Sequence, residues 1–175
     1  MAIIIAGYAG VGKTTLAKKY KNVLDLESTP YRWIVPDYKN RNPEHVKGRN
    51  IPGKTLNPNF PNNYISAIKE NFDKYDYILV WCHHENSFPH YDANGIDYEI
   101  FVPTRASLPQ YRQRYIDRGN NMEYVERAST ESLYNKRLAA YIASGRKITY
   151  LDGTMGLEDY LTNHPEYPPL IPKDE

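Results

Sequence analysis

The stretch Gly7-Tyr8-Ala9-Gly10-Val11-Gly12-Lys13-Thr14 decides the fold of this chain, because it matches the phosphate-binding pattern G-x-x-x-x-G-K-S/T at every fixed position. The apolar run Ala2–Ala6 before it predicts a buried strand, and Thr14–Tyr20 after it predicts a helix. A glycine-rich turn between a strand and a helix can aim its backbone N–H groups at phosphate oxygens. The stretch therefore predicts a phosphate cradle near the amino terminus.

The residues of this cradle have separate expected roles. Lys13 is expected to reach the β- and γ-phosphates of ATP, and the Thr14 hydroxyl is expected to bind Mg²⁺. The residues expected to bind ATP are Gly7, Tyr8, Ala9, Gly10, Val11, Gly12, Lys13, Thr14 and Thr15.

Strands alternate with helices in the rest of the chain. Four further strands are predicted at Asn22–Leu26, Tyr77–Trp81, Tyr98–Val102 and Lys147–Leu151. Helices are predicted at Tyr64–Phe72, Leu108–Arg118, Glu131–Ser144 and Leu157–Thr162, with a short helix broken by Pro89 at His83–Ala93. This alternation predicts an α/β protein in which helices flank a five-stranded parallel sheet, and together with the motif Gly7–Thr14 it predicts a P-loop NTPase fold.

The chain is predicted to form one domain over residues 1–163. Residues 28–62 are predicted to be an irregular insert on the substrate side, because six prolines interrupt residues 27–63. Residues 104–130 are the candidate helical lid. The proline-rich residues 164–175 are predicted to be an extended tail.

The composition excludes several classes of protein. The chain has 175 residues and a net charge of +1, so it is not cationic over its whole surface. Its single cysteine, Cys82, excludes an internal disulfide framework, and no apolar run approaches the ~18 residues of a membrane span. We expect a cytoplasmic protein with no membrane contact and no obligate protein partner. The 17 tyrosines, against 4 phenylalanines, predict aromatic-lined clefts.

An arginine-rich helix late in the chain favours a kinase over a switch GTPase. The N-K-x-D motif that reads guanine is absent from the sequence. Arg114 and Arg118 lie four residues apart and share one helical face, where they could neutralise a phosphoryl group during its transfer.

Polar residues at two strand ends are the candidates on the acceptor side. Asp25 and Glu27 lie at the carboxyl end of the second strand, where a carboxylate could orient an attacking hydroxyl or hold Mg²⁺ through water. The third strand ends without an aspartate, and His83 is the candidate there for contacting a phosphate or the acceptor. A zinc site is not expected, because His83, His84 and His90 are poorly spaced for one.

The insert offers cations interleaved with aromatic rings, which can hold phosphates and stack on bases. Arg32 and Trp33 are the candidate substrate-binding residues. A mobile loop that covers the ATP site is the alternative interpretation. The cations of the stretch Tyr31–Lys54 are Arg32, Lys39, Arg41, Lys47, Arg49 and Lys54.

The cradle, the run Asp25-Leu26-Glu27-Ser28 and the stretch Asn57-Pro58-Asn59-Phe60-Pro61-Asn62-Asn63-Tyr64-Ile65 together resemble small P-loop kinases of bacteriophages and prophages. Tyr77–Val80 and Tyr111–Asn120 extend the resemblance, which covers most of residues 1–127. Members are often described as adenylate-kinase-like, and the group is similar to phage kinases that phosphorylate 5-hydroxymethyluridine within DNA.

The resemblance implies an ATP- and Mg²⁺-dependent kinase that acts in a bacterial host cell, with a nucleotide or DNA acceptor. It implies ATP at Gly7–Thr15, Asp25 as the base, and Arg114 and Arg118 as lid residues. Two alternatives stay open: a nucleoside monophosphate kinase, and a nucleotide-binding regulator without transfer activity.

Overall fold

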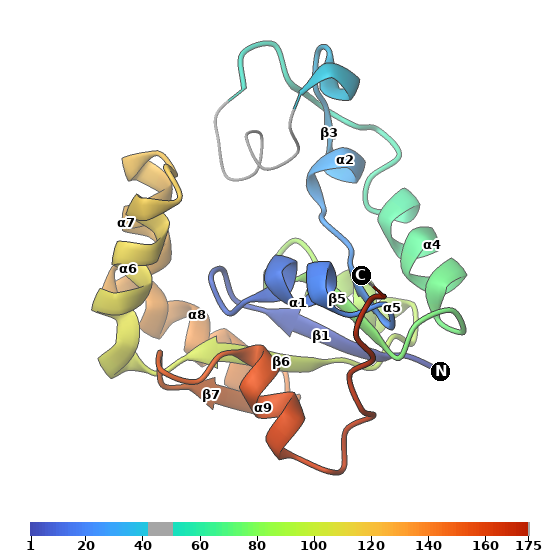
Figure 1. Ribbon diagram of the computed structural model, residues 1–175. Coiled ribbons are helices and arrows are strands. Elements are labelled where there is room, and N and C mark those ends of the chain that lie inside the picture. Colours follow the sequence, from blue (N-terminus) through green and yellow to red (C-terminus); the bar gives the residue numbers. More distant parts are fainter. Residues whose placement is uncertain (42–50, 175) are drawn as a thin grey trace.

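Five parallel strands form the central sheet, as the sequence predicts. The computed structural model describes residues 1–41 and 51–174. The strands are β1 (Ile3–Gly7), β2 (Val23–Asp25), β5 (Tyr77–Trp81), β6 (Glu99–Pro103) and β7 (Ile148–Leu151). They pair in the order β2-β5-β1-β6-β7, and every pairing is parallel (Figure 1). The central strand β1 therefore leads directly into the glycine-rich loop.

Helices cover both faces of the sheet. The connection from β1 to β2 runs toward one edge, whereas the later connections run toward the other, so right-handed crossovers place α1 (Lys13–Lys19) opposite α4 (Asn62–Asn71), α5 (Phe88–Ala93) and α8 (Glu131–Ala143). The last helix, α9 (Leu157–Asn163), packs beside α1, where Lys19 Nζ lies 2.9 Å from Glu158 Oε2. None of the helices within residues 1–41 and 51–174 has the length and apolar character to span a bilayer.

Helices stand on two sides of the carboxyl ends of the strands (Figure 1). On one side are α6 (Leu108–Asp117), which follows the 3₁₀ turn Arg105–Ser107, and α7 (Met122–Ser129). On the other side is α2 (Thr29–Arg32), followed by the short strand β3 (Trp33–Ile34). The space between them lies over the end of β1.

The insert is less irregular than its prolines suggest. Besides α2 and β3 it contains a 3₁₀ turn, Tyr38–Asn40, and the strand β4 (Thr55–Leu56), which pairs antiparallel with β3. Lys47 and Arg49, two of the cations expected there, lie outside the described residues.

Two helices, α5 and α7, differ clearly from the prediction. Pro89 does not break α5 but occupies its first turn, where a missing N–H group costs nothing, so the helix begins at Phe88 and not at His83. The helix α7 was not predicted, although Asn121 supplies a cap whose side chain accepts a hydrogen bond of 2.8 Å from the backbone N–H of Tyr124.

Tyrosine builds the core rather than mainly lining clefts. The seven largest fully buried side chains among the described residues are Tyr64, Tyr77, Tyr91, Tyr111, Tyr115, Tyr134 and Tyr141. Their hydroxyls can form hydrogen bonds with backbone groups. The Tyr64 hydroxyl donates to the carbonyl of Leu26 at 2.7 Å and accepts from the N–H of Trp81 at 3.0 Å. One buried side chain thereby joins the carboxyl ends of β2 and β5, which border the site.

The tail docks on its own domain. Asn22 donates to the carbonyl of Pro169 at 3.0 Å and accepts from the N–H of Ile171 at 2.9 Å. The N–H of Lys21 donates to the carbonyl of Ile171, also at 2.9 Å. The tail thus covers the start of β2 and lies away from the carboxyl ends of the strands.

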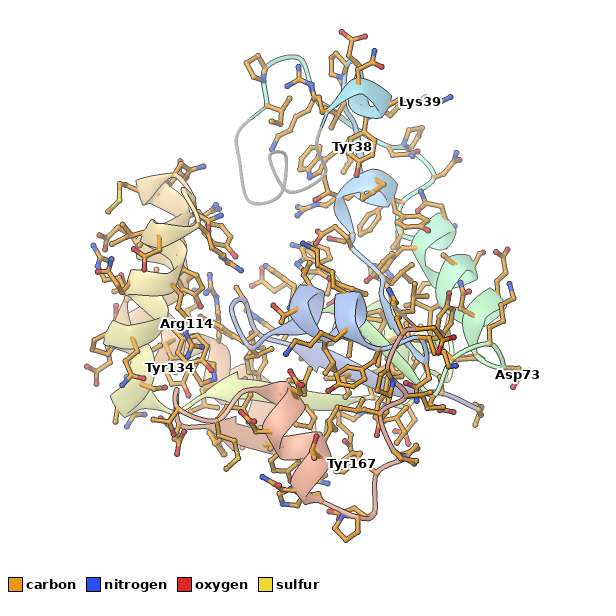
Figure 2. The ribbon with its side chains drawn as sticks, in the orientation of Figure 1. Tyr38, Lys39, Asp73, Arg114, Tyr134 and Tyr167 are labelled. Atoms are coloured by element: carbon orange, nitrogen blue, oxygen red, sulfur yellow. The ribbon has the colours of Figure 1, made fainter. Side chains whose placement is uncertain are left out.

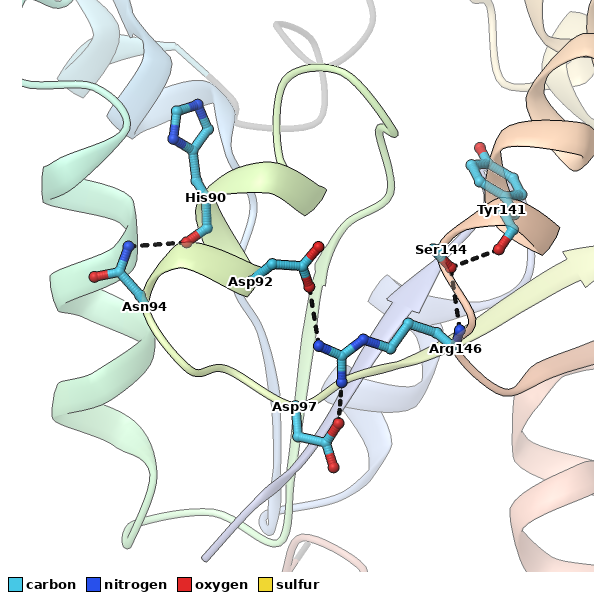
Figure 3. A network of polar contacts seen from close by, with 7 residues as sticks. All are labelled: His90, Asp92, Asn94, Asp97, Tyr141, Ser144 and Arg146. Atoms are coloured by element: carbon cyan, nitrogen blue, oxygen red, sulfur yellow. Dashed lines mark hydrogen bonds and ion pairs between the residues drawn. The ribbon is translucent and has the colours of Figure 1, made fainter.

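An arginine joins the helices of one face to the end of the sheet. Figure 3 shows Arg146, between α8 and β7, reaching Asp92 of α5 at 2.9 Å and also Asp97. The Arg146 guanidinium lies 4.5 Å from the centre of the Tyr98 ring. This network connects the carboxyl-terminal ends of α5 and α8. It lies at the amino-terminal ends of β6 and β7, away from the glycine-rich loop.

Candidate phosphate-binding site

A cavity of about 1100 Å³ lies at the carboxyl ends of β1, β2 and β5, between α2 on one side and α6 and α7 on the other. Ligands of open α/β sheets bind at this end of the strands. The structure brings every predicted site residue to this one cavity: Gly7, Tyr8, Ala9, Gly10, Val11, Gly12, Lys13, Thr14, Thr15, Asp25, Glu27, Arg32, Trp33, His83, Arg114 and Arg118.

Three consecutive carbonyl groups of the glycine-rich loop accept hydrogen bonds from residues outside the loop. The carbonyl of Ala9 accepts from the Tyr115 hydroxyl at 2.7 Å. The carbonyl of Gly10 accepts from Arg114 at 3.3 Å, and that of Val11 accepts from the N–H of Leu157 at 3.1 Å. In a trans peptide the C=O and N–H groups point in opposite directions, so these contacts turn the following N–H groups away from α6 and α9.

Two glycines give the loop its shape. Gly10 and Gly12 have φ values of 84° and 104°, in the left-handed region that side chains avoid. A Cβ on Gly10 would lie 3.0 Å from the Tyr115 ring, whereas a Cβ on Gly12 would meet no atom within 4 Å. Gly10 is thus required by the packing of α6 on the loop, and Gly12 by its backbone conformation beside open space.

Lys13 lies over the loop. Its ammonium group donates to the carbonyl of Gly7, and also to that of Tyr8 at 3.4 Å. The positive charge is therefore already at the loop before any anion binds.

Thr14 and Asp25, predicted separately, are joined by a hydrogen bond. The Thr14 hydroxyl donates to Asp25 Oδ2 at 2.8 Å. With its proton directed at the carboxylate, the hydroxyl presents its lone pairs elsewhere, as a metal ligand must. The contact favours the metal-side role for Asp25 over the role of a base.

Glu27 holds the start of α2. Its Oε1 accepts from the Thr29 hydroxyl at 3.1 Å, and this carboxylate also lines the cavity. Across residues 1–41 and 51–174, no three His, Cys, Asp or Glu side chains gather in a way that would hold a metal ion. A Mg²⁺ site at Thr14 and Asp25 would fit the usual habit of this ion, which takes one or two protein ligands, water and substrate phosphates.

The two predicted lid arginines differ in their contacts. Arg114 lies on the side of α6 nearest the loop (Figure 2), where it donates to the carbonyls of Gly10 and Gly153 and packs on the Tyr111 ring at 4.6 Å. Arg118 lies one helical turn further, exposed, with its guanidinium 5.5 Å from the centre of the Tyr115 ring. Arg114 is placed to position the loop, whereas Arg118 is available to a ligand.

Two further arginines at the cavity were not found from the sequence. Arg137 of α8 donates to the Tyr8 hydroxyl at 2.9 Å, and Arg127 of α7 lies at the cavity wall. The helix α8 that carries Arg137 was predicted without a role for this residue, and the helix α7 that carries Arg127 was not predicted. Nothing local distinguishes Arg137, whereas the Asn121 cap could have predicted α7 and so the wall that carries Arg127.

On the opposite wall, cations lie on aromatic rings. The Arg32 guanidinium lies 4.9 Å from the centre of the Trp33 ring and 4.6 Å from that of Trp81, and Lys54 Nζ lies 4.4 Å from the Trp33 ring. In this structure the indoles orient cations. The expected stacking of Trp33 on a base would require these cations to move.

His83 is held as a neutral ring. Its Nδ1 accepts from the N–H groups of Glu85 and Asn86, at 3.3 and 3.1 Å, so the ring proton of the neutral form resides on Nε2. Burial, with the nearby His84 and Arg137, lowers the pKa of His83 from its ordinary value of 6.5 to about 4. At neutral pH His83 therefore offers an uncharged N–H donor and adds no positive charge.

This low pKa predicts a pH effect on stability. Between pH 6.5 and about 4 the unfolded chain binds a proton at His83 that the folded chain does not, so the free energy of unfolding contributed by this residue falls as the pH falls. His83→Asn keeps an acceptor for the two N–H groups and removes the titration. In urea unfolding at pH 7 and pH 4.5, the variant should lose less stability than the parent, with His90→Asn as the control. An equal loss in all three proteins would contradict the prediction.

Desolvation raises the pKa of the thiol of Cys82, next to His83, from 9.0 to about 11, which favours the protonated thiol over the thiolate at neutral pH.

Comparison with known proteins adds no relative: no protein-family model, no curated protein and no solved structure matches the chain. The function is therefore argued from the site itself.

Proposed function

We propose that this protein is an ATP- and Mg²⁺-dependent kinase with a P-loop NTPase fold. Its acceptor is a hydroxyl or phosphate on a nucleotide or a modified DNA base, as the resemblance to phage kinases of 5-hydroxymethyluridine in DNA implies. The observation that carries the proposal is the loop at the end of β1, whose carbonyls of Ala9, Gly10 and Val11 are all bonded outward.

The loop has the position that such a fold requires. It follows the central strand β1, whose connection leaves toward β2, while the connection of the neighbouring β6 leaves toward β7. Adjacent strands with connections in opposite directions form the crevice in which α/β sheets bind ligands. The cavity of about 1100 Å³ lies at the same edge of the sheet, at the ends of β1, β2 and β5, and extends to the insert.

Lys13 would hold the β- and γ-phosphates, and Thr14, oriented by Asp25, would hold Mg²⁺. Bound Mg²⁺ would neutralise charge on the phosphate oxygens. In the transfer, an acceptor oxygen forms a bond to the γ-phosphorus, the bond from phosphorus to the bridging oxygen breaks, and ADP leaves. Arg118 and Arg137 line the same cavity as the loop and would stabilise the negative charge on the transferred group.

Glu27 is placed to receive the proton when the acceptor is a hydroxyl. It lines the cavity on the α2 side, whereas Asp25 is engaged with Thr14. This division gives each carboxylate of the Asp25-Leu26-Glu27 run one role, Asp25 toward the metal and Glu27 toward the acceptor.

An acceptor screen with γ-labelled ATP tests the proposal. The acceptors are the free nucleoside monophosphates and single-stranded and duplex DNA with or without 5-hydroxymethyluridine. We expect Mg²⁺-dependent transfer of label to one of these classes. Tight ATP binding without a labelled product from any acceptor would contradict the proposal and favour a nucleotide-binding regulator.

A further inference from the structure

The two walls of the cavity each carry an arginine without a carboxylate partner. Among the described residues, neither the Arg32 nor the Arg127 side chain makes a hydrogen bond or an ion pair, although both line the cavity. Of the other arginines that line the cavity, Arg114 holds loop carbonyls, Arg137 holds the Tyr8 hydroxyl, and exposed Arg118 makes a long contact of 3.5 Å with Asn120 of its own chain segment. The unpaired charges therefore belong to the walls and not to the loop.

Arg32 is oriented as well as unpaired. The indoles of Trp33 and Trp81 both lie within 5 Å of its guanidinium, which fixes the plane of the group and leaves its N–H edges for a ligand. Arg32 and Arg127 line the same cavity, and the positive charge of Arg127, after burial, lowers the pKa of Arg32.

Two cations that repel each other across a cavity are stabilised by an anion between them. A phosphate suits the pair, because guanidinium groups bind phosphate oxygens through paired N–H donors. Lys54, over the Trp33 ring, adds a third positive charge on the insert side.

We propose that Arg32 and Arg127 form an anion subsite that binds a phosphate ester already present on the acceptor. The acceptor is then a phosphorylated nucleotide unit and not a neutral nucleoside or sugar. This inference rests on the proposed kinase function and narrows its substrate. The phosphate can belong to a free nucleoside monophosphate or to the backbone of a DNA strand, and both sources supply the same oxygens.

The protein carries its own reporter for this subsite. Its two tryptophans, Trp33 and Trp81, both contact Arg32, so an anion that binds the guanidinium should change the intrinsic fluorescence. The full chain is titrated with inorganic phosphate, with each common nucleoside 5′-monophosphate, with the matching nucleoside, and with a single-stranded oligothymidylate. Each titration is done with and without a saturating non-hydrolysable ATP analogue and Mg²⁺, and thermal unfolding confirms that each variant is folded.

We expect phosphorylated probes, but not nucleosides, to change the fluorescence. Arg32→Gln and Arg127→Gln should each weaken this binding about tenfold or more and leave the affinity for the ATP analogue, followed by calorimetry, within about twofold. Arg105→Gln is the matched control, since Arg105 contacts Asn135 and Glu131 outside the cavity, and its binding should be unchanged. A preference for monophosphates or for the oligonucleotide identifies the source of the phosphate.

Equal binding of nucleosides and their monophosphates, or parental affinity in both arginine variants, would overturn the inference. So would the absence of binding by every phosphorylated probe. The proposed function fails separately, by loss of binding of the ATP analogue to the parent protein, and the titrations without analogue still decide whether the subsite exists.

Discussion

Replacing Lys13 by alanine is expected to reduce phosphoryl transfer by at least about 10³-fold, because one buried electrostatic contact to the transferred group contributes on this scale. The ammonium group lies over the loop, at the carbonyls of Gly7 and Tyr8, where the phosphates of ATP would be. The shape of the loop does not depend on it, since Tyr115, Arg114 and the N–H of Leu157 hold the loop carbonyls from outside. The variant should therefore keep its fold.

The measurement is the initial rate of labelled transfer to the acceptor found in the screen, together with thermal unfolding. Lys21→Ala is the control, because Lys21 is exposed and lies outside the cavity. Parental turnover in a folded Lys13→Ala variant would remove Lys13 from the mechanism and the phosphate role from the loop.

Asp25→Asn is expected to lower the rate of transfer by about 10²-fold or more at ordinary Mg²⁺ concentrations. The amide can still accept the Thr14 hydroxyl, which now lies 2.8 Å from Asp25 Oδ2, so the change removes a charge and keeps the contact. If Asp25 serves the metal, higher Mg²⁺ concentrations should restore part of the rate. If it serves as a base, the rate should stay low at every Mg²⁺ concentration.

Glu27→Gln is the companion variant in this experiment. Glu27 lines the cavity on the α2 side, where we propose that the acceptor binds, so its loss should change the rate without changing the Mg²⁺ dependence. A Mg²⁺ requirement that shifts in Glu27→Gln and not in Asp25→Asn would reverse the roles assigned to the two carboxylates.

Local patterns predicted the sheet and the loop well. The strand at Tyr77–Trp81 lies where its apolar run placed it, and the other four strands differ by at most two residues at an end. A buried parallel strand is recognisable as a continuous apolar run, and a phosphate loop is recognisable from the spacing of its glycines and lysine. Both features can therefore be predicted from short stretches of sequence.

Contacts between residues far apart in the chain were not predicted from the sequence. The hydrogen bond between Thr14 and Asp25 joins two site residues that were predicted separately, and it underlies the proposed metal-side role of Asp25. Arg127 and Arg137 reach the cavity only because α7 and α8 fold back on the loop. The Trp33 ring was expected to stack on a base, but Arg32 and Lys54 lie over it. Arg32 also lies over the ring of Trp81, which is distant in the sequence, so local patterns could not show this arrangement.

Tyrosine shows the same limit. Seventeen tyrosines suggested binding surfaces, yet the largest buried side chains are tyrosines whose hydroxyls often close backbone carbonyls. Composition shows that tyrosine is frequent. Whether a tyrosine hydroxyl contacts a ligand or bonds to the end of a strand depends on the fold.

Isothermal titration of the folded protein with ATP and Mg²⁺ tests the phosphate loop most directly. We expect saturable binding of one nucleotide per chain, and no detectable binding to Lys13→Ala at the same concentrations. A well-folded parent protein that gives no heat of binding with ATP and Mg²⁺ would contradict the assignment of Gly7–Thr14 as a triphosphate site.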